Sequence, residues 1–450
     1  MISVVFGLLG FSIVVFVHEL GHLLAAKAVG VEVLAFSIGL GRPILRRTWR
    51  GTEYRLSILP LGGYCKMKGE QALIRAWAEK RNRVDIEPGD FLAARPLARI
   101  LVLAAGPGVN YLFAVLVFAI VAIVGFRVST YPSRVVVADP SDSQSPAVVA
   151  GIETGDRITA VNGNRVETFW DLQEAVRDAE AGALDVSVER DGERFSTSVT
   201  PRQDPASGRR LIEVVAWVEP LVAEIVPGSP ADRAGLTVGD RIVAIDNTTV
   251  RHAIDLEREL ESGGGRPVTL LVQADGGERE VRLVPGTGEA GNPVIGIAYR
   301  QLEIRTEARG PVLGLIEGVR QANAAIVGTV QGLAQLVSGR LDPREAVMGP
   351  PRIFYLVGRV TIESAADGIG RALLNLFNIL SIISLSLAIF NLIPIPVLDG
   401  GQIVLTLWEL ITRHRPSPRL TYHYQMVGVV LILGLLIFVV VNDVLFLSQG

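Results

Sequence analysis

The stretch VVFVHELGHLLAAK, residues Val14 to Lys27, places two histidines and a glutamate inside one of the most apolar runs of the chain. Ionisable side chains are costly inside a bilayer, and those that occur there are functional by default. A helix has 3.6 residues per turn, so His18 and His22 lie on one face with Glu19 beside them. Histidines with this spacing bind zinc, and the glutamate then serves as general base toward water. The alternative, a pair of hydrogen-bonded helix histidines, leaves three polar residues in five positions unexplained.

The composition of the chain is that of a membrane protein. Of its 450 residues, 49% are apolar and only 20% are charged, and the mean hydropathy is +0.39. A secretion signal is the alternative for the first apolar segment, but no Lys or Arg precedes its apolar core. Four segments have the length of about 20 residues that a bilayer core requires, namely about 2–25, 100–125, 372–393 and 425–447.

The charges of the loops predict an orientation in the membrane. Between Lys27 and Arg99 there are 14 Lys plus Arg against 7 Asp plus Glu. Short loops rich in Lys and Arg stay in the cytoplasm. The loop with Arg413, Arg415 and Arg419 belongs on the same side. Both termini and the long polar region between the second and third spans are therefore expected outside.

A third metal ligand is expected in NLIPIPVLDGGQ, residues Asn391 to Gln402. A catalytic zinc ion normally has three protein ligands and one open position. Asp399 follows Pro394 and Pro396, which break the third span, and the two glycines after it are expected to loosen the backbone. Irregular backbone at membrane depth is tolerated where it lines a cavity. Spans one and three run in the same direction, so both segments meet near the cytoplasmic side. The alternative for the aspartate is a simple turn at the end of a helix.

Together these features resemble the site-2 protease family of intramembrane zinc metalloproteases, in its bacterial branch of the regulator-of-sigma-E type. LPLGGYCKMKGE (59–70) and AAGPGVNYLFA (104–114) match that branch as well as HELGH and NLIPIPVLDGG do. The resemblance implies that Asp399 is the third zinc ligand and that Asn391 helps to hold the substrate. Gln402 stands where many members have histidine, at a position that is not a ligand in the family.

The polar region contains an internal duplication. At an offset of 84, Ser145–Ala175 aligns without gaps with Ser229–Glu259, and 13 of 31 positions are identical. Two copies of this size indicate duplicated domains rather than a solenoid. Each copy predicts a strand, a helix and then alternating strands such as LDVSVER and VTLLVQA. The copies resemble PDZ domains, which commonly bind an extended chain by strand addition. They are alternatively spacers or, as the family implies, a screen that excludes large substrates.

Two further segments have predictions with open alternatives. Residues 50–70 predict a hairpin with a Gly-Gly turn that approaches the site from the cytoplasmic face. Its edge strand is expected to pair with an unwound substrate, or else it is an ordinary interfacial hairpin. Residues 311–360 have mixed apolar and polar faces. They are expected along the outer membrane surface or in the core of the outside domains.

The expected fold class is therefore membrane α-helical, with four transmembrane helices that carry a zinc site, plus two α/β PDZ-like domains outside the membrane. The predicted division is 1–126 for the first two spans with HExxH and the cytoplasmic hairpin loop, 127–210 and 211–300 for the two PDZ-like domains, 301–371 for a linker with amphipathic helices, and 372–450 for the last two spans with the LDG motif.

We expect a zinc endopeptidase that cuts another protein in or near its transmembrane helix, with Glu19 as the base. The resemblance implies a bacterial inner (plasma) membrane, surrounding lipid, and single-span substrates such as an anti-sigma factor or a remnant signal peptide. It also implies an upstream site-1 protease that shortens the same substrate. No nucleic-acid partner is expected. A catalytically silent PDZ scaffold or adaptor is the first alternative, although it has no need of Glu19. A transporter is the second, although no repeat of the spans is found.

Overall fold

The computed structural model describes residues 2–80, 84–125, 127–179, 182–203, 210–274, 276–288, 292–306, 308–339, 349–365 and 368–449. The chain divides into two compact units, which are described separately. The helical unit comprises Met1–Gly125 and Glu307–Gly450, and the β-rich unit comprises Phe126–Thr306.

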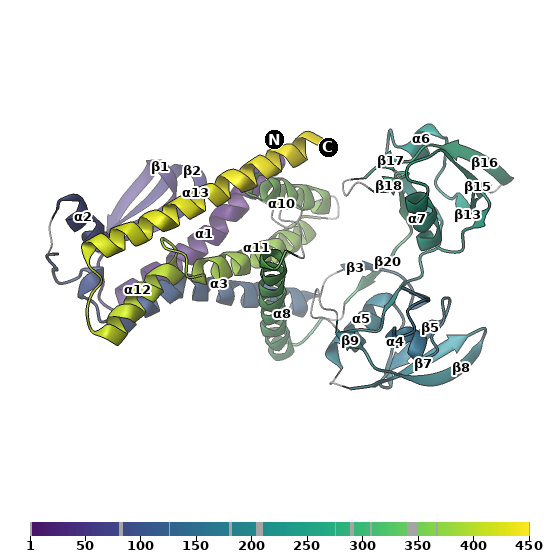
Figure 1. Cartoon of the computed structure of the whole chain (residues 1–450), viewed down its shortest axis with the longest axis horizontal. Helices are drawn as coiled ribbons and strands as arrows, with labels where there is room; N and C mark the ends of the chain where they lie inside the picture. The colour runs from purple at the N-terminus through teal and green to yellow at the C-terminus, as the bar shows by residue number, and fades with distance from the viewer. Residues whose placement is uncertain are drawn as a thin grey trace. The chain divides into compact units, whose positions relative to one another are not determined.

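Long apolar helices form the helical unit (Figure 1). In the part of the chain that the structure describes, four helical stretches are long and apolar enough to cross a membrane, as predicted: Val5–Ala28, Pro96–Val124, Ile369–Leu392 and Pro418–Asp443. They belong to helices α1 (Ile2–Ala28), α3 (Pro96–Val124), α11 (Ile369–Leu392) and α13 (Pro418–Gln449). A Cβ atom at Gly21 would lie 2.8 Å from the carbonyl carbon of Ala105, so this glycine allows α1 and α3 to pack closely.

Shorter elements complete the helical unit: α2 (Ala72–Ala78), the 3-10 helix η1 (Phe91–Ala93), α8 (Pro311–Val337), α10 (Pro350–Ala365) and α12 (Asp399–Thr412). Helix α8 packs on α3, where Gly318 would place a Cβ 3.0 Å from the Cβ of Ala119. Helix α10 packs on α1, with Phe11 and Phe354 in edge-to-face contact. The described part of 311–360 therefore packs in the helical unit, and the alternative of a place in the core of the outside domains is wrong. Residues 340–348 of this segment lie outside the described residues, and its place at the membrane surface stays a prediction.

The loop after α1 forms an antiparallel hairpin of β1 (Val33–Trp49) and β2 (Thr52–Met67). Its turn lies at Arg50 and Gly51, with φ of 48° and 77°, and not at the predicted Gly-Gly pair. Two consecutive positive φ values suit the tight turns that match the twist of paired strands. The predicted turn position was wrong because Arg50 gives no turn signal by itself.

The Gly-Gly pair instead allows β2 to bend over β1. Phe36 of β1 is paired with Tyr54 in the first half of β2 and with Cys65 in the second half. A Cβ atom at Gly63 would lie 2.7 Å from the carbonyl oxygen of Ser37 and 3.5 Å from Cγ of Glu19. The bend thus brings the second half of β2 next to the HELGH segment of α1. Whether the free edge of this strand receives substrate stays a prediction.

The β-rich unit contains two copies of one fold, as predicted (Figure 1). The first has sheet order β6-β5-β7-β8, and the second has order β14-β13-β15-β16. The elements of the first are α4 (Pro146–Val149), β5 (Arg157–Val161), β6 (Asn164–Arg165), α5 (Phe169–Asp178), β7 (Leu184–Arg190) and β8 (Glu193–Val199). Those of the second are α6 (Pro230–Arg233), β13 (Arg241–Ile245), β14 (Thr248–Thr249), α7 (Ala253–Ser262), β15 (Val268–Ala274) and β16 (Gly277–Leu283). Each element of the second copy begins 84 residues after its counterpart, so the duplication extends through the whole fold.

Each copy has its own apolar core. Ile158 and Leu184 are fully buried in the first copy, as Ile242 and Val268 are in the second. Ile212 also lies in the first core, while the predicted boundary between residues 210 and 211 stays a prediction. The other strands are β3 (Arg127–Thr130), β4 (Val135–Val137), β9 (Arg202–Gln203), β10 (Arg210–Leu211), β11 (Val214–Ala216), β12 (Val222–Ile225), β17 (Gly286–Thr287), β18 (Pro293–Val294), β19 (Ile297–Tyr299) and β20 (Leu302–Arg305).

The first and last strands of the β-rich unit pair with each other. β3 and β20 are antiparallel, with Thr130 opposite Leu302 and Arg127 opposite Arg305. The chain therefore enters and leaves this unit through one two-stranded ribbon, which we call the β3–β20 neck.

Candidate active site

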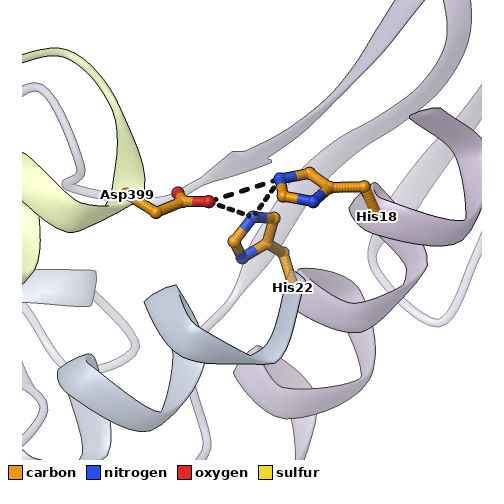
Figure 2. Close-up of side chains that lie close together, drawn as sticks. All are labelled: His18, His22 and Asp399. Atoms are coloured by element: carbon orange, nitrogen blue, oxygen red, sulfur yellow. Dashed lines mark hydrogen bonds and ion pairs between the residues drawn. The ribbon is translucent and has the colours of Figure 1, made fainter. Parts of the chain in front are cut away.

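Three side chains from distant parts of the sequence meet inside the helical unit (Figure 2). Nε2 of His18 lies 3.2 Å from Nε2 of His22, and Oδ2 of Asp399 lies 3.3 Å from the first and 3.4 Å from the second. Both histidines are buried, and the aspartate side chain is 17% exposed. Among the described residues, this is the one group of three or more His, Cys, Asp or Glu side chains that could hold a metal ion.

The triangle of ligand atoms has the dimensions of a zinc site. Zinc in proteins is tetrahedral, with bonds of about 2.0–2.2 Å to nitrogen and oxygen, so two of its ligand atoms lie about 3.3–3.5 Å apart. The three separations in the structure, 3.2, 3.3 and 3.4 Å, lie within 0.1 Å of this range. Three lone pairs that face one point also repel one another unless a cation lies between them. His18, His22 and Asp399 therefore fit a zinc ion by distance and by chemistry.

The aspartate reaches the histidines because the chain breaks after α11. That helix ends at Leu392, and α12 begins at Asp399 itself. Between them Val397 adopts a φ of 84°, which is unusual for a β-branched residue and typical of functional sites. The break at the two prolines was predicted. The prediction that Gly400 and Gly401 loosen the backbone was wrong. Both glycines are helical, and they let α12 pack closely on the backbone of residues 392–396.

A cavity of about 370 Å³ opens beside the triangle. Glu19 and Asn391 both line it together with the three candidate ligands. The backbone of Cys65 in β2 hydrogen-bonds to Glu19, and Nδ2 of Asn391 lies 3.0 Å from Nε2 of His18. The structure thus brings all five sequence-predicted site residues to one place. A carboxylate beside an open metal position is the arrangement that activates a water molecule.

Nδ1 of each histidine faces a group of α3. Nδ1 of His22 lies 2.9 Å from the carbonyl oxygen of Val102. Nδ1 of His18 lies 3.3 Å from Nδ2 of Asn110. The bond of one ring nitrogen decides which tautomer an imidazole adopts. The carbonyl oxygen of Val102 can accept a proton only from Nδ1 of His22, which leaves Nε2 of that ring free for a metal ion.

The cavity also contains charged residues that the sequence analysis did not identify. Glu70 accepts a hydrogen bond from the backbone N–H of Met67 at 3.3 Å, and burial raises the pKa of Glu70. Arg99 is 3% exposed and lies 2.7 Å from Glu409, which also contacts Arg415 at 3.0 Å. Nothing in their spacing along the sequence links these residues. Only Glu409 could have been noticed in the sequence, because it is a glutamate inside the apolar segment after Asp399.

The remaining histidines lie elsewhere. His252 is buried in the second copy of the duplicated fold, where it caps α7. His414 and His423 are exposed. None of the three lies in the described metal-ligand group.

Known proteins match nearly the whole length of the chain. The model of peptidase family M50 matches residues 6–435. A Treponema pallidum protein named "Putative zinc metalloprotease" is 35% identical over 99% of this chain and 100% of its own length. "Protease RseP" of Yersinia pestis is 29% identical over 97% of this chain and 99% of its own. "Regulator of sigma E protease" of Haemophilus influenzae is 27% identical over 97% of each chain.

Solved structures match a part of the chain, and a PDZ domain is among them. The PDZ domain of an SdrC-like protein from Listeria monocytogenes matches 19% of this chain and 90% of that domain at 21% identity, with a TM-score of 0.17.

Proposed function

Because this chain belongs to peptidase family M50, the site-2 proteases, we propose that His18, His22 and Asp399 hold its zinc ion and that Glu19 is its general base. The chain is an intramembrane zinc metalloprotease, so a metal site and a base must exist within it. The observation that carries the assignment is the triangle of ligand atoms with sides of 3.2, 3.3 and 3.4 Å.

The chain's own residues perform the remaining chemistry. Zinc, when bound, acts as a Lewis acid and makes water a nucleophile at neutral pH. Glu19 lines the same cavity as the ligands, takes a proton from the attacking water and passes it to the leaving amine. Asn391 lies within 3.0 Å of His18, where its amide donates to the carbonyl oxygen of the scissile peptide and holds the substrate in place.

The substrate and the orientation are part of the proposal. The name of the Haemophilus relative, "Regulator of sigma E protease", indicates a protease that regulates a sigma factor. We accordingly propose a membrane-tethered anti-sigma factor, shortened outside by a site-1 protease, as the substrate class, with remnant signal peptides as the second class. We also propose that the active site lies near the cytoplasmic side and the β-rich unit outside the bacterial inner membrane, and the basic loop between Lys27 and Arg99 supports this orientation. A silent scaffold is not favoured, because the base and the metal ligands lie together in one cavity.

Two variants separate the base from the ligand. Glu19→Gln keeps the metal triangle but cannot accept a proton, so zinc content stays unchanged while cleavage falls by about 10²–10⁴-fold or more. Asp399→Ala removes a ligand, and zinc affinity falls by more than about 100-fold, which exceeds the usual loss from an outer partner. Zinc is measured in the purified full-length protein, and cleavage is measured on a coexpressed single-span substrate.

Glu70→Gln is the matched control, since Glu70 is a carboxylate of the same cavity outside the triangle. It is expected to retain zinc. Near-normal cleavage by Glu19→Gln would refute the base, and full zinc occupancy in Asp399→Ala would refute the ligand.

A further inference from the structure

The segment AAGPGVN of α3 was part of the family resemblance, yet no role in the chemistry has been given to it. It lies against the metal triangle. Asn110 is 0% exposed, and its side-chain amide is directed at His18 with Nδ2 3.3 Å from Nδ1. The amide oxygen Oδ1 is buried and has no hydrogen-bond partner.

The protonation that zinc requires decides what this contact must be. An imidazole that offers Nε2 to a metal ion carries its proton on Nδ1, and that N–H needs an acceptor. The amide nitrogen is itself a donor and cannot accept this proton. The oxygen and nitrogen of an asparagine amide have nearly the same shape, and a half-turn of the amide exchanges them. The half-turn places the unpartnered Oδ1 against Nδ1 of His18.

We propose that Asn110 is a positioning residue for the metal centre: its Oδ1 accepts the Nδ1–H of His18 and so directs Nε2 toward zinc. Val102 supplies the equivalent acceptor to His22 through its backbone carbonyl, at 2.9 Å from Nδ1. Helix α3 therefore sets the tautomer of both histidines: a backbone carbonyl acts on His22, and the side chain of Asn110 acts on His18. The proposal rests on the assignment of His18 as a zinc ligand.

The contact is buried and well supported. Ser384 of α11 donates to the backbone carbonyl of Asn110 at 3.3 Å, and its side chain is fully buried. Asn110 thus lies where α1, α3 and α11 meet, with little freedom to move away from the ring. A buried polar side chain in an apolar helix destabilises the fold unless it makes a compensating bond. The bond to His18 is that compensation.

The test compares zinc affinity in variants of the full-length protein, by competition with a chromogenic chelator. Asn110→Leu keeps the approximate size of the side chain and removes the acceptor, and zinc affinity is expected to fall by about 10–100-fold. Asn110→Asp keeps an acceptor at the same place and is expected to remain within a few fold of the unsubstituted protein. Ser384→Ala disturbs the same helix contact without touching the ring and is expected to retain full affinity.

The variants also distinguish positioning from packing. If Asn110 only fills space, Asn110→Leu binds zinc as well as the unsubstituted protein, and the proposal is wrong. Equal losses in Asn110→Asp, Asn110→Leu and Ser384→Ala would overturn it as well. Thermal unfolding of the metal-free proteins shows whether each variant folds. If the leucine does not fit, Asn110→Ala replaces it with the same expectation.

Failure of this proposal differs from failure of the proposed function. If the unsubstituted protein does not bind zinc, or if His18→Ala binds it equally well, the metal assignment itself is wrong. If His18→Ala loses zinc and Asn110→Leu does not, the assignment of His18 stands and only the role of Asn110 is refuted.

Discussion

Two glycines of α3 differ in their contact with the proposed metal ligands. A Cβ atom at Gly106 would overlap Nε2 of His22 and lie 2.8 Å from Cε1 of His18, whereas a Cβ at Gly108 would meet no atom within 4 Å. Alanine in a helix is more favourable than glycine by about 0.8–1 kcal/mol. We therefore expect Gly108→Ala to leave zinc affinity unchanged and to raise stability slightly. In Gly106→Ala the new methyl group displaces Nε2 of His22. We expect zinc affinity to fall by about tenfold or more, as it does when a metal ligand loses the partner that orients it.

Chelator competition and thermal unfolding of the two variants measure these effects. Equal zinc affinities for Gly106→Ala and Gly108→Ala would contradict the packing of α3 against the imidazoles. The unsubstituted protein serves as the reference for both.

At the level of residues, spacing predicted part of the site and could not predict the rest. His18, Glu19 and His22 share one helix face, so the helical period alone brings them together. Asp399 was found because prolines beside a carboxylate at membrane depth indicate a cavity. Asn110 has no such signal, because a single amide in an apolar helix gives no period. Its role depends on a contact across 92 positions of the sequence.

At the level of elements, the two copies of the duplicated fold cap the same helix differently. α5 begins after Thr168, which exchanges hydrogen bonds with Asp171, whereas α7 begins after His252. Nδ1 of His252 accepts from the N–H of Asp255 at 3.3 Å, so the cap requires a neutral ring. Burial lowers the pKa of His252 below its usual 6.5, although the nearby Asp255 carboxylate opposes the shift.

The stability of the second copy should therefore depend on pH. Below about pH 6.5 the unfolded chain binds a proton that the folded ring does not, so the free energy of unfolding falls as the pH drops. Above about pH 6.5 the ring is neutral in both states, and it does not change the free energy of unfolding. Hydrogen exchange of β15 and β16 at pH 7.5 and 5.5, corrected for intrinsic rates, measures this change. His252→Thr, which copies the cap of the first domain, is expected to remove it. If the unsubstituted protein and His252→Thr lose the same protection of β15 and β16 on going from pH 7.5 to 5.5, His252 is not the cause of the pH dependence.

The same comparison shows which elements a sequence can predict. The 84-residue offset predicted the first strand, the long helix and the later strands of each copy, because both copies repeat the same apolar alternation. The short elements α4, α6, β6 and β14 were not predicted, since they have too few residues to show a period. The hairpin turn at Arg50 was missed, since a positive φ at arginine depends on the strands around it. Helix α12 was missed because its two glycines were taken as backbone breaks, whereas tertiary packing makes them contact points.

At the scale of the whole molecule, the β3–β20 neck allows a clean deletion of the β-rich unit. Thr130 and Leu302 are opposite each other, so residues 131–301 can be replaced by Asn-Gly, a favoured two-residue hairpin turn. Every proposed metal ligand is retained. If the PDZ-like domains screen substrates by size, the deletion variant is expected to cut a substrate that still carries its bulky outer domain, and to cut a trimmed stub at the normal rate.

Cleavage of both substrates is compared in cells at matched expression, with Glu19→Gln in the deletion variant as the inactive control. A folded deletion variant that no longer cuts the trimmed stub would show that the domains recruit substrate instead of excluding it. Strand addition to the PDZ-like sheets would then be the better account.

The neck also bears on how the helices find each other during folding. Unless the β-rich unit is folded, about 180 residues of flexible chain separate α3 from α8, and bringing their ends together has an entropic cost that grows with the logarithm of that length. Pairing of β3 with β20 shortens the effective connection to a few residues and reduces this cost by about 2–3 kcal/mol. A β-rich unit that folds as soon as it is synthesised would thus hold the end of α3 close to the start of α8. The helices from α8 onward would then pack on α1 and α3 almost as if the two groups of helices were neighbours in sequence.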